Sequence, residues 1–184
     1  RNILMETRMR LDHIAYRVKD RNEAAHFFED MLGYKRASEL PEGFDVQFED
    51  GTTAKCLVME PPEETTARIA HGMFNQEWHS PPEIFVSDGS ENSIVSQWVE
   101  DTGGGIHHLA YEVDSVEETM DEWKKEGIEF TTDKPLTCPG LIQVFTKPHP
   151  ITGVIYELIE REKQGFCQDN VKDLMNSTKD TNNG

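Results

Sequence analysis

LDHIAYRV, residues 11–18, and IHHLAYEV, residues 106–113, are two copies of one pattern. The histidine, alanine, tyrosine and valine coincide, and the first and fourth positions are aliphatic in both copies. Both stretches are rich in aliphatic and aromatic residues and end at a polar break, which is typical of β-strands. An internal repeat of this kind predicts two structural modules built on the same plan.

Each copy is followed by the same expected order of elements. Residues 22–32 and 116–126 have apolar side chains at helical spacing, and Gly33 and Gly127 stand where a glycine commonly ends a helix. Strands are then expected at residues 34–40, 44–50 and 54–59 in the first copy, and at 129–131, 141–146 and 153–160 in the second. The sequence therefore predicts an α+β fold made of two βαβββ modules.

The modules are expected at residues 11–100 and 101–161, after an N-terminal extension or cloning remnant at residues 1–10. Residues 162–184 form a tail with one short helix near 169–175. Three further segments are assigned within the first module: a long loop at 60–82, a short last strand at 83–86 and a short helix at 93–100.

The net charge of −17 at pH 7 predicts a surface that repels phosphate backbones and anionic lipid. We therefore expect neither nucleic acid nor a membrane as a partner, and no apolar run is long enough for a membrane span. Residues 1–10 lack the features of a secretory signal. The cysteines Cys56, Cys138 and Cys167 are widely spaced and suit a reducing compartment better than a disulfide framework. A cytoplasmic protein with a small-molecule partner is expected.

His13 and His108 occupy the same position in the two copies. A lone histidine on a strand is most often structural, but two at equivalent positions would face each other across a pseudo-twofold axis. Glu157 lies in an otherwise apolar strand, on the same face as Ile155 and Ile159, where a carboxylate is costly unless it is paired or binds a metal. Two histidines and one carboxylate form the open ligand face of many metal enzymes. We predict a divalent metal bound by His13, His108 and Glu157.

Glu83 stands in the corresponding strand of the first module. It could be a fourth ligand, a general base, or a charge at the start of a strand beside Pro82. His107 precedes His108 and is expected to point to the opposite face of the strand, so we do not assign it as a ligand. The remaining histidines have no counterpart in the repeat and are expected in loops or facing solvent: His26, His71, His79 and His149.

The double βαβββ order, with its DH and HH strands and the late YELIE strand at residues 156–160, resembles the vicinal-oxygen-chelate superfamily. That superfamily includes glyoxalase I, methylmalonyl-CoA epimerase and ring-cleaving dioxygenases. The resemblance covers roughly residues 11–160, and His13, His108 and Glu157 match its ligand positions one by one. It implies that the two modules curl into one mixed eight-stranded sheet, an open cup around the metal.

Two segments are similar to the catalytic domain of 4-hydroxyphenylpyruvate dioxygenases. QVFTKP, residues 143–148, looks like a strand of that family, and QGF, residues 164–166, looks like the start of its closing segment. The resemblance implies that Gln143 and Phe166 shape the substrate pocket and that the short terminal helix is its lid. The chain departs from the family's closing pattern at Cys167, which replaces a glycine.

The leading interpretation that this resemblance implies is a non-haem Fe(II) oxygenase acting on a 2-oxo acid, which would chelate the metal through two adjacent oxygens. The segment GIHHLAYEV and Glu83 also look like methylmalonyl-CoA epimerase or glyoxalase I. The alternative is therefore an isomerase or lyase acting on an acyl-CoA or other thioester, with Co, Ni, Zn or Mn in place of iron. A non-catalytic binding or resistance protein is a third reading, and a homodimer is left open.

Overall fold

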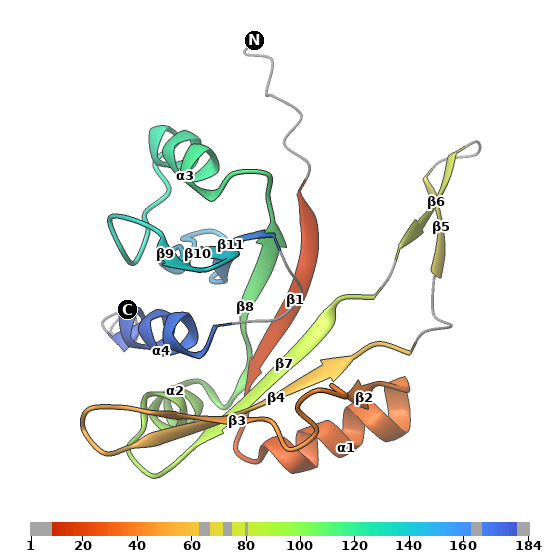
Figure 1. Cartoon of the computed structure of the whole chain (residues 1–184), viewed down its shortest axis with the longest axis vertical. Coiled ribbons are helices and arrows are strands. Elements are labelled where there is room, and N and C mark those ends of the chain that lie inside the picture. Colours follow the sequence, from red (N-terminus) through yellow and green to blue (C-terminus); the bar gives the residue numbers. More distant parts are fainter. Residues whose placement is uncertain (1–8, 63–66, 72–74, 80, 163–166, 180–184) are drawn as a thin grey trace.

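The computed structural model describes residues 9–62, 67–71, 75–79, 81–162 and 167–179, in which a strongly curved sheet carries four helices (Figure 1). The strands are β1 (Arg10–Arg17), β2 (Lys35–Arg36), β3 (Phe44–Gln47), β4 (Thr53–Glu60), β5 (Ala67–His71), β6 (Asn75–His79), β7 (Glu83–Gly89), β8 (Gly105–Glu112), β9 (Leu136–Cys138), β10 (Leu141–Phe145) and β11 (Ile155–Arg161). The helices are α1 (Arg21–Leu32), α2 (Ile94–Thr102), α3 (Val116–Lys125) and α4 (Gln168–Ser177).

The main sheet has the strand order β2-β4-β7-β1-β8-β11-β10-β9, with β3 paired to β4. β1 and β8, the two repeated strands, lie antiparallel at its centre. β7 runs parallel to β1 on one side, and β11 runs parallel to β8 on the other. The same arrangement of strands thus leads outward from the centre in both directions. This confirms the predicted α+β fold, a mixed sheet curved into a cup.

α1 and α3 cover the outer face of the two halves in equivalent ways (Figure 1). α1 begins at Asp20, whose side chain accepts hydrogen bonds from two backbone N–H groups, and ends at Gly33 with φ of 72°. Beneath α1 lies an apolar cluster that includes Phe28 and Met59, and beneath α3 lies one that includes Met120 and Leu158. Each half therefore has its own outer core.

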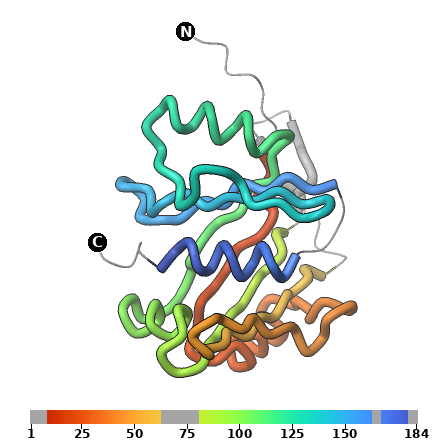
Figure 2. Tube along the Cα trace, turned by 60° about the vertical axis from the view of Figure 1, so that its left-hand side comes forward, coloured from red at the N-terminus to blue at the C-terminus, as the bar shows by residue number. Residues whose placement is uncertain are grey.

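α4 lies on the concave side of the sheet, between the two halves, as two views show (Figures 1 and 2). It contacts β9 and β10 of one half and β3 of the other. Val171 and Met175 pack with the apolar cluster around Phe44, while Leu174 packs against Phe145. The predicted tail helix therefore crosses the mouth of the cup and is held from both sides.

Three expectations about the elements are corrected. The segment expected as a long loop contains a two-stranded antiparallel sheet, β5 and β6, because polar residues can still pair as strands through their backbones. The strand expected at residues 34–40 shortens to β2, and the one at 129–131 is a single bridge between Phe130 and Thr146. β9, at the edge of the sheet, was not expected.

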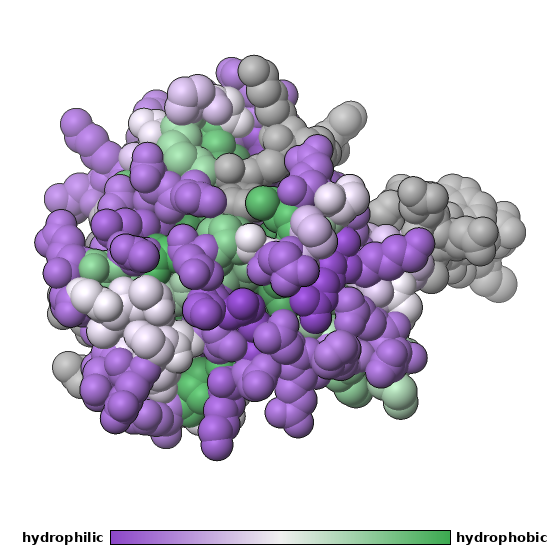
Figure 3. All heavy atoms as spheres, turned by 60° about the horizontal axis from the view of Figure 1, so that its bottom comes forward, coloured by the Kyte–Doolittle hydropathy of each residue, from purple (hydrophilic) through white to green (hydrophobic). Residues whose placement is uncertain are grey.

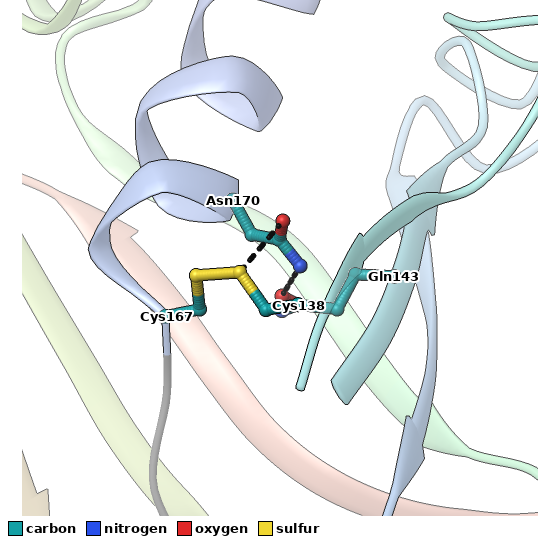
Figure 4. The surroundings of a disulfide bond; sticks show 4 residues. All are labelled: Cys138, Gln143, Cys167 and Asn170. Atoms are coloured by element: carbon teal, nitrogen blue, oxygen red, sulfur yellow. Dashed lines mark hydrogen bonds between the residues drawn. A yellow bond between two sulfur atoms is a disulfide. The ribbon is translucent and has the colours of Figure 1, made fainter. Parts of the chain in front are cut away.

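Cys138 and Cys167 form a disulfide, with Cα atoms 6.4 Å apart, whereas Cys56 is buried and free. The bond joins the end of β9 to the residue before α4 (Figure 4). The expectation that the cysteines form no disulfide is therefore wrong. Sequence spacing gave no indication of the pair, since the two cysteines meet only because α4 packs on β9.

The outer surface is largely hydrophilic, with small hydrophobic patches, on the face shown in Figure 3. This agrees with the excess of 35 acidic over 18 basic side chains. Among the helices of the described residues, none has the length and apolar character needed to cross a membrane.

Candidate metal centre

The structure brings together the three predicted ligands, which come from three adjacent strands, β1, β8 and β11. His13 Nε2 and His108 Nε2 lie 3.3 and 3.1 Å from the same oxygen, Oε2 of Glu157. One ligand atom from each of the three residues lies within 4.8 Å of the other two. Glu157 is only 1% exposed, so its carboxylate is held in place and faces the two rings.

Register shifts between β1 and β8 occur beside both histidines. Pairing passes from Leu11 with Tyr111 to His13 with Ala110, so Asp12 is an extra residue on β1. It passes from Ala15 with His108 to Tyr16 with Ile106, so His107 is an extra residue on β8. Such β-bulges re-aim side chains and break the strict alternation of a strand. Each of the two predicted ligand histidines is therefore preceded by a residue that does not point away from it.

These two extra residues hold the outer nitrogens of the histidine rings. His13 Nδ1 donates to Asp12 Oδ2 at 2.8 Å, and His108 Nδ1 lies 2.9 Å from His107 Nδ1. In both rings Nε2 is left for a metal, which is the usual division of roles in metal-binding histidines. The expectation that His107 faces the opposite side of the strand is wrong, because the bulge brings it to the cavity wall.

Charge and burial have opposing effects on the pKa values of the three candidate ligands. Burial alone would lower the pKa of His13, but the charge of Glu157 and hydrogen bonds to Asp12 and Glu157 raise it to about 9. Burial lowers the pKa of His108, against an opposing effect of Glu157. Burial alone would raise the pKa of Glu157, but the charge of His13 and hydrogen bonds from both histidines hold it well below its ordinary value. Near neutral pH, the metal-free site therefore contains one imidazolium.

Metal affinity should rise with pH, because a metal must displace the proton of His13. Below the His13 pKa of about 9, we expect the association constant to increase about tenfold per pH unit, and above it to level off. Asp12→Asn, which weakens the support for the imidazolium, should move this plateau to lower pH. Competition for Co(II) with a chelating indicator between pH 6.5 and 9.5 measures the slope. If the affinity for Co(II) does not change between pH 6.5 and 9.5, the assignment of His13 as a ligand is contradicted.

Glu83 lies in the wall of the same cavity, paired through the backbone with His13. Burial raises the pKa of Glu83, and so does the charge of Asp12, against the opposing charges of Arg161 and His13. Asp12 itself is buried and receives hydrogen bonds from Arg161 at 3.0 and 3.2 Å. Burial alone would raise the pKa of Asp12, but its bonds to His13 and Arg161 lower it. Glu83 is thus a partly buried carboxyl group beside a fixed, charged pair.

Gln143 supports the carboxylate rather than standing free in the pocket. Its Nε2 donates to Glu157 Oε1 at 2.6 Å, and its Oε1 accepts from Asn170 Nδ2 of α4 at 3.1 Å. Asn170 Oδ1 lies 3.3 Å from the sulfur of Cys138 (Figure 4), and this is a contact only, because a sulfur in a disulfide carries no hydrogen. Phe166, the other residue assigned to the pocket, lies outside the described residues.

The donor set suits a divalent transition metal. Two neutral imidazole nitrogens and one carboxylate oxygen, with second nitrogens and second oxygen held by neighbours, form the three-residue face that leaves coordination positions open. Both imidazole rings are directed at one oxygen of the buried carboxylate. An ion bound there would replace these two contacts with one bond to each of the three side chains. The residues therefore fit a metal, and they do not fix which one.

A cavity of about 300 Å³ opens in front of this centre. Its wall combines apolar and polar residues. The apolar ones include Phe85 and Phe145 beside the histidines and three residues of α4. This volume is at the lower end of small-molecule sites. The other polar residues of the wall are Arg17, Ser38, Glu39, Glu60, Glu83, Ser87, His107, Gln143 and Arg161.

Three of the functional neighbours were not identified from the sequence: Asp12, Arg161 and Arg17. Strict strand alternation places Asp12 on the face opposite His13. Arg161 stands at the charged end of β11, where a side chain is expected to face solvent, yet it reaches back to Asp12 across the sheet. Arg17 could have been noticed, since alternation along β1 places it on the same face as His13 in an otherwise apolar stretch.

Comparison with known proteins gives consistent relatives. The family model described as "Glyoxalase/Bleomycin resistance protein/Dioxygenase superfamily" matches residues 12–138. The mitochondrial methylmalonyl-CoA epimerase of Mus musculus is 25% identical over 153 residues, which cover 81% of this chain and 71% of that protein. A crystal structure of methylmalonyl-CoA epimerase matches with a TM-score of 0.57 and 22% identity, covering 83% of this chain and 95% of the other.

A second solved structure is similar over more of the fold. A mutant of 4-hydroxymandelate synthase from Streptomyces coelicolor has a TM-score of 0.73 at 17% identity. The match covers 94% of this chain but only 54% of that one. At such identity the likeness concerns the fold alone.

Proposed function

The chain belongs to the glyoxalase/bleomycin resistance protein/dioxygenase superfamily, and within it we propose a metal-dependent isomerase that removes a proton alpha to a carbonyl group. The relatives named methylmalonyl-CoA epimerase support this choice over an oxygenase. Their name points to an acyl thioester as the substrate class. The metal would be Co, Ni, Zn or Mn, held by His13, His108 and Glu157.

The position of Glu83 carries the proposal. It is a carboxyl group in the cavity wall, on the strand next to that of His13, and its pKa is raised by burial. A general base needs to reach the proton it removes and to have a pKa shifted toward the operating pH. Glu83 meets both requirements better than Glu157, whose two oxygens are already engaged by the histidines and Gln143.

Each group then has a defined task. A bound metal supplies positive charge beside the carbonyl oxygen of the substrate, which makes the neighbouring carbon more acidic. Glu83 accepts the proton from that carbon, and its own carboxyl group then holds the proton and can return it. Inversion of the carbon needs a second proton carrier on the other side, and Glu39 and Glu60 also line the cavity. The apolar wall from α4 limits the access of water.

Glu83→Gln should stop proton exchange without emptying the metal centre. In D₂O, we expect the Co(II)-loaded protein to incorporate deuterium at the alpha carbon of methylmalonyl-CoA. Mass spectrometry measures the rate of this incorporation. The variant should lower this rate by about 10²- to 10⁴-fold, the usual contribution of a general base. Unchanged cobalt content would identify Glu83 as a base, and a parallel loss of cobalt would identify it as a fourth ligand.

Glu112→Gln is the matched control, because Glu112 is an acidic residue of β8 that pairs with Arg10 outside the cavity. It should leave both exchange and metal content unchanged. Absence of exchange in the metal-loaded natural sequence would refute the proposed reaction.

The oxygenase reading remains the second candidate because of α4. A helix that closes the cup, joined through Asn170 and Gln143 to the ligand Glu157, matches what the resemblance to 4-hydroxyphenylpyruvate dioxygenases implies. Under this reading iron would be the metal and a 2-oxo acid the substrate. Consumption of oxygen by the Fe(II)-loaded protein with 4-hydroxyphenylpyruvate, without exchange of methylmalonyl-CoA, would favour it.

A further inference from the structure

Arg17 is a buried cation without an acidic partner in the described part of the chain. It is 3% exposed, and its Nη1 has no hydrogen-bond partner there. In the same described part, its Nη2 makes a long hydrogen bond to Thr178 Oγ1, at 3.4 Å. The guanidinium group also lies 5.9 Å from the ring of Trp98. Burying a charge in this way is costly unless something pairs with it.

The described residues around Arg17 do not supply a compensating negative charge. Burial lowers the pKa of Arg17 to about 9, and the only opposing influence comes from the thiol of Cys56. Burial strongly raises the pKa of that thiol, so it is neutral at physiological pH. Among the described residues, therefore, no negative charge compensates Arg17.

His107 offers a second polar group close by. Its Nε2 is also buried without a hydrogen-bond partner among the described residues, and its ring contacts Trp98 as Arg17 does. Two buried nitrogen atoms without a partner in that part of the chain, Arg17 Nη1 and His107 Nε2, thus stand near one another.

Both side chains belong to the wall of the cavity that contains the candidate metal centre. Arg17 lies four residues beyond His13 on β1, so their Cα atoms are roughly 13 Å apart along the strand. A ligand could therefore reach the metal with one end and Arg17 with the other. Ala15 stands between them on β1 and lines the same cavity, which suits a short hydrocarbon spacer.

We propose that Arg17, with His107, is an anion-binding subsite that receives a carboxylate of the substrate away from the metal. The substrate class is then an acyl compound with a second, negatively charged end. This rests on the proposed function only in placing a metal in the same cavity. A guanidinium group is well suited to a carboxylate, which it can bind through two parallel hydrogen bonds.

Binding of paired acids to the Co(II)-loaded protein tests the subsite. Adipate, pimelate and suberate are compared with hexanoate, heptanoate and octanoate by isothermal titration calorimetry. Each pair has the same number of carbons and differs in the second carboxylate. We expect at least one diacid to bind tenfold or more tightly than its monoacid partner. Arg17→Met should abolish this preference and leave cobalt affinity unchanged.

Thermal unfolding distinguishes a binding role from a structural one. Without ligand, Arg17→Met should keep or raise the melting temperature, because it removes an unpaired buried charge. Arg36→Met is the matched control: Arg36 pairs with Glu29 outside the cavity, and its loss should leave the diacid preference intact. Arg17→Gln serves the same purpose if the methionine variant does not fold.

If the natural sequence binds diacids and monoacids equally, the proposed anion-binding subsite is refuted. It is also refuted if the Arg17 variants keep an undiminished preference for diacids. Neither result depends on turnover. The isomerase proposal fails instead on absent proton exchange, so the two failures are separate.

Discussion

Replacing His13, His108 or Glu157 by alanine is expected to abolish stoichiometric metal binding while the fold survives. The three ligand atoms come from three strands and converge within 4.8 Å, so removing any one leaves a pair with much weaker affinity. The loss should exceed the roughly 10- to 100-fold cost of removing an outer partner of a ligand. Elemental analysis after dialysis against a weak chelator measures the metal content, and circular dichroism of each variant shows whether the fold survives.

His26→Ala is the control for these variants, because His26 is an exposed histidine on α1 that pairs with Glu29. It should retain one metal per chain. The metal content of Asp12→Asn should lie between that of His26→Ala and that of the triad variants, since Asp12 orients the ring of His13 without being a ligand. A triad variant that still holds one metal per chain would show that the metal binds elsewhere.

Ending the chain after Glu162 should remove most of the stability of the protein. Val171, Leu174 and Met175 of α4 are buried, and burial of such side chains contributes about 1.5–3 kcal/mol each. Their sum, roughly 5–9 kcal/mol, is comparable with the whole free energy of unfolding of many domains, about 5–15 kcal/mol. Urea unfolding of the truncated chain tests this, and a loss of less than about 2 kcal/mol would refute it.

A milder change separates the lid role from stability. Leu174→Ala should cost about 2–5 kcal/mol and leave the metal content unchanged. It should also slow proton exchange, because Leu174 lines the cavity opposite the metal centre. Asp173→Ala, on the exposed face of the same helix, should change neither property. If Leu174→Ala lowers stability alone, α4 is a structural helix and not a lid.

The repeated strands made most of this fold predictable. His13 and His108 could be paired because they occupy equal positions in two recognisable copies, and Glu157 because a carboxylate in an apolar strand needs a partner. α1, α3 and α4 were found by their apolar spacing. The positions of these helices and of the repeated strands could be predicted because local periodicity and repetition can be recognised in the sequence alone.

The features that were missed depend on contacts between distant segments. The bulges that re-aim Asp12 and His107 arise from the pairing of β1 with β8, and single-strand alternation predicts the opposite face for both. The Cys138–Cys167 bond exists because α4 docks on β9. Alternation along β1 places Arg17 on the face of His13, but only the structure shows that its Nη1 has no hydrogen-bond partner among the described residues.

The central place of β1 in the sheet also determines when a metal can bind during synthesis. β1 pairs with β7 and β8, which leave the ribosome much later, and Glu157 of β11 follows later still. Such distant pairings are slow to form compared with local ones. Nearly all of the described sheet must therefore be synthesised and paired before His13 can meet His108 and Glu157. We expect the ion to enter an almost finished fold and not to nucleate it.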